Sequence, residues 1–278
     1  MYMRCLAKGS GLEIKVMRIG FYQFTPIPKK VKLNLDRIKS ALSHIQADLI
    51  VLPELCATGY LFTSRSELSK YAEPVPDGPS CMTFLDLCRT YNLNIVFGMA
   101  ERNSNKIYNT AVLITAEGKV HCYRKAHLFL NEKDRFDPGN TRFQVFQINS
   151  TKVGMLICFD YFFPEVARSL ALAGAQIICH PSNLVLDYAQ KMTFTRAAEN
   201  RMFWILANRT GREESGAKTI IFTGRSQIVG PDGRLLYRAG SDTEELPVIE
   251  IAPSDALDKK VTPRNDLFSD RRTDLYQS

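Results

Sequence analysis

The chain has 278 residues, 45% of them hydrophobic, and a mean hydropathy of −0.15, which is typical of a folded globular protein and excludes a largely disordered chain. The formal net charge of +7 arises from 36 basic and 29 acidic residues spread along the sequence, and no basic helix or stacking motif accompanies it, so we expect no nucleic-acid partner. No stretch approaches the roughly 18 apolar residues of a membrane-spanning helix, so we expect no membrane partner. The 7 cysteines include no CxxC pair and are typical of a reducing compartment, so we expect a cytoplasmic protein.

Strand and helix patterns alternate through the first part of the chain. Leu35, Ile38 and Leu42 recur at the 3-4 spacing of a helix, between two continuous apolar runs that are typical of buried strands. The same alternation then repeats with a shorter helix. The elements expected here are strands at 17–24, 47–54 and 93–101 and helices at 32–46 and 81–92.

Two hairpins enclose a second alternating segment. Strands flank the Glu117-Gly118 turn within residues 110–125, and Pro231-Asp232-Gly233 provides turn chemistry within residues 224–240. The similarity of the two hairpins indicates two related halves. The elements expected between them are strands at 152–159, 175–182 and 203–211 and helices at 164–174 and 188–202.

These elements predict an α/β fold built on two packed sheets. Strands that are apolar along their whole length are usually covered on both faces, and the two hairpins add antiparallel strands. We therefore expect two mixed β-sheets packed face to face, with helices outside. Because the first clear strand begins at Met17, residues 1–16 are predicted to be an N-terminal extension, and residues 17–278 one domain that includes the C-terminal tail.

Three chemically reactive side chains follow predicted strands. Glu54 follows the apolar run ADLIVLP, Lys125 follows GKVHCYR, and Cys158 follows KVGMLI. Catalytic and ligand sites of α/β sheets gather at the carboxyl ends of strands, so we expect these three side chains to lie together.

An acid, an amine and a thiol at one site predict cleavage of a carbon-nitrogen bond through a thioester. Positive charge from Lys125 and the N-terminus of the helix starting near Pro164 favour the thiolate of Cys158. Glu54 is then the natural base for the thiol and later for water. Lys125 and the backbone N–H of Phe159 are candidate donors to the oxyanion.

Ordinary structural roles compete with each of these assignments. A buried cysteine is commonly an inert apolar residue, and Cys56, Cys88, Cys122 and Cys179 keep that interpretation. His121 and Cys122 point to opposite faces of a strand, so they do not form a metal site with His127. We expect neither a metal nor another cofactor.

The phrases LPELCATGY, YRKAHLF and ICFDYFFPEVAR resemble the three catalytic motifs of the nitrilase superfamily of carbon-nitrogen hydrolases. The likeness extends from about Met17 to the tail, and its longer phrases are most similar to the archaeal branch of thermoactive nitrilases. The resemblance implies an α-β-β-α sandwich, with Glu54 as general base, Lys125 as stabiliser of the tetrahedral intermediate and Cys158 as nucleophile.

The same resemblance implies two further features. A second glutamate that many members carry after the lysine matches Glu132, where it positions substrate or Lys125 and assists proton transfer. Members usually form dimers or higher even homo-oligomers with help from the C-terminal tail, which residues 265–276 resemble.

The expected substrate is a small, largely uncharged aliphatic nitrile or amide. An acidic substrate would call for an arginine beside the motifs, and none is compelling. Alternatives of the same superfamily are a carbamoyl-compound amidohydrolase and a thioester-forming acyltransferase, and a non-catalytic binding protein is a third class. The residues expected to line the substrate pocket are Tyr60, Phe129, Phe159, Tyr161, Phe162 and Asn183.

Overall fold

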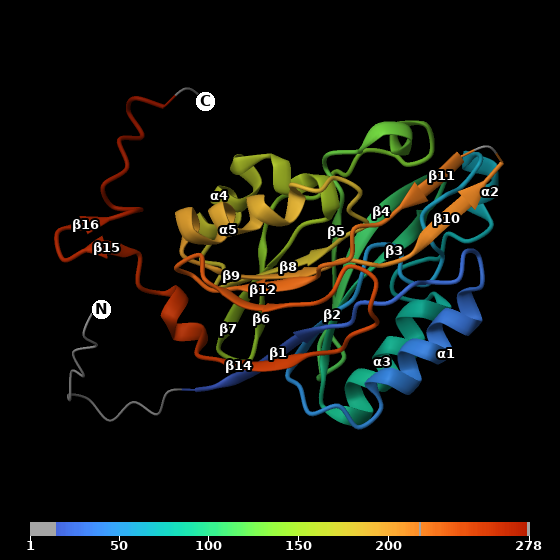
Figure 1. Ribbon diagram of the computed structural model, residues 1–278, viewed down its shortest axis with the longest axis horizontal. Helices are drawn as coiled ribbons and strands as arrows, with labels where there is room; N and C mark the ends of the chain where they lie inside the picture. The colour runs from blue at the N-terminus through green and yellow to red at the C-terminus, as the bar shows by residue number, and fades with distance from the viewer. Residues whose placement is uncertain (1–14, 217, 277–278) are drawn as a thin grey trace.

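Two six-stranded mixed β-sheets form the centre of the molecule in the computed structural model, which describes residues 15–216 and 218–276 (Figure 1). The first sheet has the strand order β14-β1-β2-β3-β4-β5, with β1, β2 and β3 parallel and the outer pairings antiparallel. Its strands are β1 (Met17–Phe21), β2 (Leu49–Val51), β3 (Asn94–Asn103), β4 (Lys106–Ile114), β5 (Val120–Arg124) and β14 (Val248–Ile251).

The second sheet repeats the pairing pattern of the first. Its order is β13-β12-β9-β8-β7-β6, with β7, β8 and β9 parallel and the outer pairings antiparallel. The predicted hairpins β4-β5 and β12-β13 therefore occupy corresponding positions in two related halves. The strands of this sheet are β6 (Val145–Ile148), β7 (Thr151–Met155), β8 (Ile177–Pro181), β9 (Phe203–Ala207), β12 (Gln227–Val229) and β13 (Leu235–Arg238).

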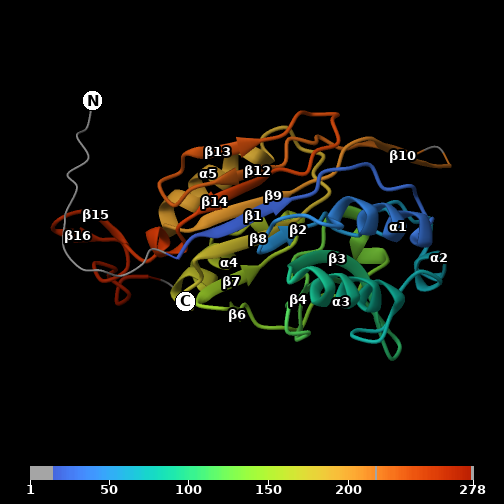
Figure 2. The same cartoon turned by 90° about the horizontal axis from the view of Figure 1, so that it is seen from below.

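Helices cover the outer face of each sheet, so the predicted four-layer α-β-β-α sandwich is confirmed (Figures 1 and 2). The pair α1 and α3 packs on the first sheet, and the pair α4 and α5 packs on the second. These helices are α1 (Val31–Leu42), α3 (Pro79–Tyr91), α4 (Pro164–Leu172) and α5 (Ala189–Asn200). Shorter helices are α2 (Arg65–Ser69) and the 3₁₀ helices η1 (Leu130–Asp134), η2 (Cys158–Phe162) and η3 (Pro253–Ala256).

Strand alternation divides the apolar side chains between two cores. In β2, Leu49 and Val51 belong to the core between the sheets, whereas Ile50 belongs to the core beneath α1 and α3. Successive residues of a strand point to opposite faces, which explains why these strands are apolar throughout. The rigid double layer carries the strand ends that bear the candidate site.

Several predicted boundaries differ from the structure. The first helix ends at Leu42 rather than residue 46, because Ser43 is extended and His44 has a φ of 68°. The predicted extension falls almost wholly on residues 1–14, which lie outside the described residues.

Within the described chain, no helix is both long and apolar enough to cross a membrane. Strands that were not predicted are short, and most are polar or partly exposed; they are β6, β14, β10 (Arg212–Ser215), β11 (Lys218–Ile221), β15 (Lys260–Thr262) and β16 (Asn265–Asp266).

Candidate active site

The ends of β2 and β5 bring Glu54 and Lys125 into direct contact. Lys125 follows β5 immediately, and its Nζ lies 2.8 Å from Oε1 of Glu54. Both side chains are fully buried. A charged pair without water is stable only when each group has close partners.

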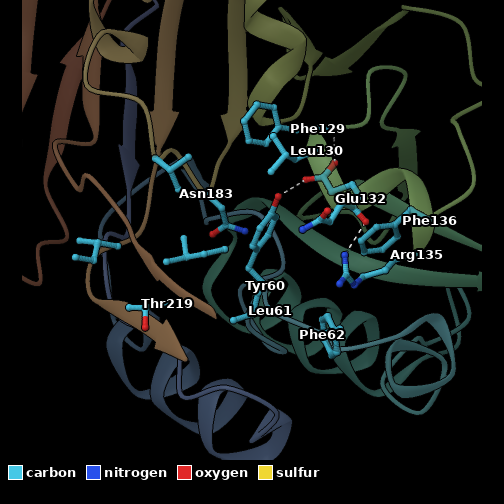
Figure 3. A pocket seen from close by; sticks show the side chains of 14 residues that line it. Tyr60, Leu61, Phe62, Phe129, Leu130, Glu132, Arg135, Phe136, Asn183 and Thr219 are labelled. Carbon is cyan, nitrogen blue, oxygen red and sulfur yellow. Dashed lines mark hydrogen bonds between the residues drawn. The ribbon is translucent and has the colours of Figure 1, made fainter. Parts of the chain in front are cut away.

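Glu132 completes a buried cluster around the same ammonium group. It lies in η1, and its Oε2 is 2.8 Å from Nζ of Lys125. The hydroxyl of Tyr60 donates a 2.8 Å hydrogen bond to Oε1 of Glu132, as Figure 3 shows, and the N–H of Phe129 donates to Oε2 over 3.1 Å. These contacts place Glu132 beside Lys125 and not in a solvated loop.

The two carboxylate oxygens of Glu54 have different surroundings. Oε1 accepts hydrogen bonds from Lys125 and, over 2.7 Å, from Nδ2 of Asn109. Oε2 is buried and has no hydrogen-bond partner among the protein groups that the structure describes. Buried polar atoms nearly always have a partner, so this oxygen is free to accept a proton from a reacting group.

The backbone around Glu54 is held by close packing. A Cβ atom on Gly98 of β3 would lie 2.5 Å from Cα of Glu54, so only glycine permits this approach. Nδ2 of Asn183 donates a 2.9 Å hydrogen bond to the carbonyl of Glu54. Glu54 is therefore fixed through its main chain as well as through its carboxylate.

Cys158 lies at the sharp turn between β7 and η2. Its φ of 42° is in the left-handed region, which is unusual for a residue with a side chain. Nε2 of His180 lies 3.0 Å from the carbonyl oxygen of Cys158, and the indole N–H of Trp204 donates to Nδ1 of His180 over 3.1 Å. Because Nδ1 accepts, the imidazole proton lies on Nε2 and is donated to Cys158.

Burial and neighbouring charges determine the protonation states of the cluster. Burial favours the neutral form of Lys125, but the carboxylates of Glu132 and Glu54 outweigh it and raise its pKa well above the ordinary value. Burial also raises the pKa of Glu54. Burial and then the charge of Glu54 raise the pKa of the Cys158 thiol, and the charge of Lys125 acts in the opposite direction without outweighing them. The resting site holds a thiol that needs a base.

Two adjoining cavities contain most of the residues predicted to contact substrate. The larger, of about 410 Å³, is lined by Tyr60, Phe129, Glu132 and Asn183 (Figure 3). The smaller is lined by Cys158 and shares Phe129 and Asn183 with the larger.

Of the other aromatic residues predicted to line the pocket, two line the smaller cavity and one lines neither cavity. Phe159 and Tyr161 line the smaller cavity beside Cys158. Phe162 lines neither cavity and is 41% exposed, because it lies at the outer end of η2, where its ring packs against Phe159 and Phe163.

Several residues of the site were not predicted. Asn109 is a buried polar residue within the apolar strand β4, a pattern that could have identified it. Arg135 follows Glu132 at the i, i+3 spacing of one helical turn and lines the larger cavity. Thr219 and Ile220 reach the cavity from the unpredicted strand β11.

The histidines near Lys125 have other partners than a metal. Nδ1 of His127 lies 2.8 Å from Oδ1 of Asp160, and the ring of His121 stacks on Phe146 with centroids 4.7 Å apart. In the described part of the chain, no group of three or more His, Cys, Asp or Glu side chains is arranged to hold a metal ion.

Comparison with known proteins identifies the family of this fold and site. The family model described as carbon-nitrogen hydrolase matches residues 18–258. A nitrilase of Pyrococcus abyssi is 39% identical over 94% of this chain and 99% of its own. An (R)-stereoselective amidase of a Pseudomonas species is 34% identical over 92% of each chain, and an N-carbamoylputrescine amidase of Solanum lycopersicum is 33% identical over 87% of each. The chain belongs to the carbon-nitrogen hydrolase family.

Solved structures agree with this assignment. A carbon-nitrogen hydrolase from Helicobacter pylori G27 superimposes with a TM-score of 0.85 at 26% identity, covering 94% of this chain and 97% of that one. A variant of the amidase from Nesterenkonia sp. AN1 superimposes with a TM-score of 0.76 at 27% identity, covering 96% and 98%. That variant carries the acetamide moiety of fluoroacetamide covalently added at its active-site cysteine.

Proposed function

We propose that this carbon-nitrogen hydrolase cleaves a small aliphatic amide or nitrile and releases ammonia. Cys158 is the nucleophile, Glu54 the general base, Lys125 the stabiliser of the tetrahedral intermediate, and Glu132 the residue that positions Lys125. Oε2 of Glu54 carries this proposal, since it is a buried carboxylate oxygen with no partner among the described protein groups. Glu54 shares Lys125 with Glu132, and its charge acts on the Cys158 thiol.

The first half of the reaction transfers the acyl group to sulfur. Oε2 of Glu54 takes the thiol proton as Sγ of Cys158 bonds to the carbonyl carbon of an amide, and the carbonyl oxygen becomes anionic. Glu54 then returns the proton to the nitrogen, the C–N bond breaks, and ammonia leaves a thioester on Cys158. For a nitrile, the same attack gives a thioimidate, which water converts to the thioester with loss of ammonia.

Lys125 and the start of η2 provide for the negative charge. Glu54 and Glu132 engage the ammonium group, and the two oxygens of Glu132, at 2.9 and 2.8 Å, can share one N–H, so one of the three donors remains for the oxyanion. The N–H of Phe159 lies in the first turn of η2, where no intrahelical acceptor exists. Both donors are fixed before substrate arrives.

The second half of the reaction consumes water. Glu54 removes a proton from water as its oxygen attacks the thioester carbon, and the carboxylic acid leaves as Cys158 regains its proton. The larger cavity is bounded mainly by apolar side chains such as Leu61, Phe62 and Ile220, which supports a short acyl chain over a peptide.

Ammonia release from a panel of nitriles, amides and N-carbamoyl compounds tests the reaction and separates the substrate classes. We expect the wild type to release ammonia from small amides or nitriles, and Cys158→Ala to release none while keeping its fold. A preference for N-carbamoyl compounds would move the assignment toward the carbamoyl amidases. Added hydroxylamine would reveal an acyltransferase if transfer products exceed hydrolysis.

We also propose a cytoplasmic homodimer or higher even homo-oligomer. The six cysteines of the described residues are free thiols, which supports a reducing compartment. The segment after η3 extends away from both sheets in Figure 1 and exposes Leu257, Val261 and Leu275, which supports a role in assembly. Light scattering of the full chain and of a chain ending at residue 258 tests this, because truncation is expected to lower the mass.

A further inference from the structure

We propose that Arg135 selects substrates whose acyl chain ends in a carboxylate, so that the preferred amides are half-amides of short dicarboxylic acids or the corresponding cyano acids. This inference rests on the proposed function, because it concerns the far end of the same substrate. Such a substrate is charged at its far end, unlike the largely uncharged one expected from the sequence, because Arg135 lies in the cavity wall although it is outside the three motifs.

Arg135 lies in the wall of the larger cavity. The residue follows η1 directly and lines the 410 Å³ cavity together with Glu132 and Tyr60 (Figure 3). Nη1 of its guanidinium group donates a 2.7 Å hydrogen bond to the carbonyl of Asn131, which holds the side chain along the cavity wall. A cation is therefore fixed in the same space that leads to the candidate catalytic groups.

Arg135 has no counter-ion in the part of the chain that the structure describes. Among residues 15–216 and 218–276, no carboxylate lies within 4.0 Å of its guanidinium group, and its Nε is buried without a hydrogen-bond partner. The acids nearest in sequence with known partners are engaged elsewhere, Glu132 by Lys125 and Asp137 by Arg65. Partly buried guanidinium groups are normally paired, so an anionic ligand group is the natural partner of Arg135.

The other residues that line the cavity around Arg135 are mainly apolar, and they determine which kind of chain can join the two ends of the substrate. Leu61, Phe62, Phe136 and Ile220 line the cavity around Arg135. These side chains favour a spacer of methylene groups, while Lys125 and Cys158 receive the amide or nitrile end. Planar bidentate contact between a guanidinium group and a carboxylate provides the orientation.

Kinetics with matched substrates test the proposal. The half-amide of glutaric acid and pentanamide have the same number of carbon atoms and differ at the end remote from the amide. We expect the wild type to have a kcat/KM for the half-amide at least about tenfold above that for pentanamide, since a hydrogen bond to a charged group is worth roughly a ten- to hundredfold change in affinity. Arg135→Met should remove this preference by raising the KM for the half-amide at least about tenfold. Arg142→Met, at an exposed arginine, is the control and should behave as the wild type.

Binding to the Cys158→Ala variant gives a second measurement that needs no turnover. Calorimetry should show that this variant binds the half-amide about tenfold or more tightly than Cys158→Ala/Arg135→Met does. Equal affinities, or equal hydrolysis of both substrates by the wild type, would overturn the role of Arg135 and leave the hydrolase proposal intact. Absence of ammonia from every compound with normal half-amide binding would instead overturn the proposed reaction.

Discussion

Nζ of Lys125 lies 2.8 Å from Oε1 of Glu54 and 2.8 Å from Oε2 of Glu132, so one buried ammonium group is shared by two buried carboxylates. Lys125→Met should leave these two acids facing each other without a cation. We expect a loss of about 3–5 kcal/mol in the free energy of unfolding and a loss of about 10³-fold or more in kcat/KM. Urea unfolding and ammonia release measure the two effects. Lys119→Met, at an exposed lysine, is the control, and half of the wild-type activity in Lys125→Met would contradict the assignment.

The approach of Gly98 to Glu54 gives a second prediction. In Gly98→Ala the new methyl group would meet Cα of Glu54 at 2.5 Å, so the backbone must move. Displacement of a catalytic group by about 1 Å can cost on the order of 100-fold in rate, and we expect kcat to fall by about this factor. Gly230→Ala should retain activity, because the nearest neighbour of its Cβ would be the side-chain carboxylate of Asp232 at 3.1 Å and the next atoms lie at 3.7 Å. Equal rates in both variants would show that this packing does not position the base.

Glu213 connects the β10-β11 hairpin to the loop that carries Tyr60. Its carboxylate pairs with buried Arg209 and accepts hydrogen bonds from the N–H groups of Tyr60, at 3.0 Å, and Leu61, at 2.7 Å. Glu213→Gln leaves the guanidinium group of Arg209 buried without a charged partner, so we expect about 3 kcal/mol of destabilisation. Denaturant unfolding checks this, with exposed Glu214→Gln as the control on the same strand. Identical denaturation midpoints for the two variants would show that these contacts of Glu213 do not stabilise the fold.

His180 should make folding stability depend on pH. Burial lowers its pKa to about 4 from the ordinary 6.5. Between these values the unfolded chain binds a proton that the folded protein does not, so stability falls as pH decreases from about 6.5 to about 4. The full loss is roughly 3 kcal/mol, because each tenfold difference in proton affinity is worth about 1.4 kcal/mol.

The measurement is the unfolding free energy of wild type and His180→Gln across this pH range. The glutamine can still donate to the carbonyl of Cys158 but does not titrate, so its curve should be flatter by about 3 kcal/mol. Around pH 8 the imidazole is neutral in both the folded and the unfolded state, so the difference in unfolding free energy between the two proteins should not change with pH. Parallel curves below pH 6.5 would show that His180 is not held neutral by the fold.

The layers of the fold and the grouping of strand ends could be predicted because they depend on local patterns. Continuous apolar runs specify strands covered on both faces, and Glu54, Lys125 and Cys158 each follow such a run. The short strands β10 and β11 could not be predicted, since their side chains are mainly polar or exposed and only pairing across a hairpin makes them strands.

Contacts between distant segments could not be predicted from the sequence, because local patterns do not show which segments meet in the fold. Asn109 reaches Glu54 from another strand, and Glu213 reaches the loop at Tyr60 from the other half of the chain. Arg135 carried a local signal, its spacing from Glu132, but only the cavity shows that it faces substrate space. The sequence indicated that Lys125 favours the thiolate of Cys158, but the larger opposing effect of burial on the thiol pKa depends on the packing around it.

Rapid acid quench of the enzyme during amide turnover, followed by intact-protein and peptide mass spectrometry, tests the central claim most directly. We predict an adduct with the mass of the amide less ammonia on the peptide that contains Cys158. It should persist longer in Glu54→Gln, because water activation is lost, and be absent from Cys158→Ala. Ammonia release by Cys158→Ala at half the wild-type rate, or an adduct confined to another cysteine, would contradict the account.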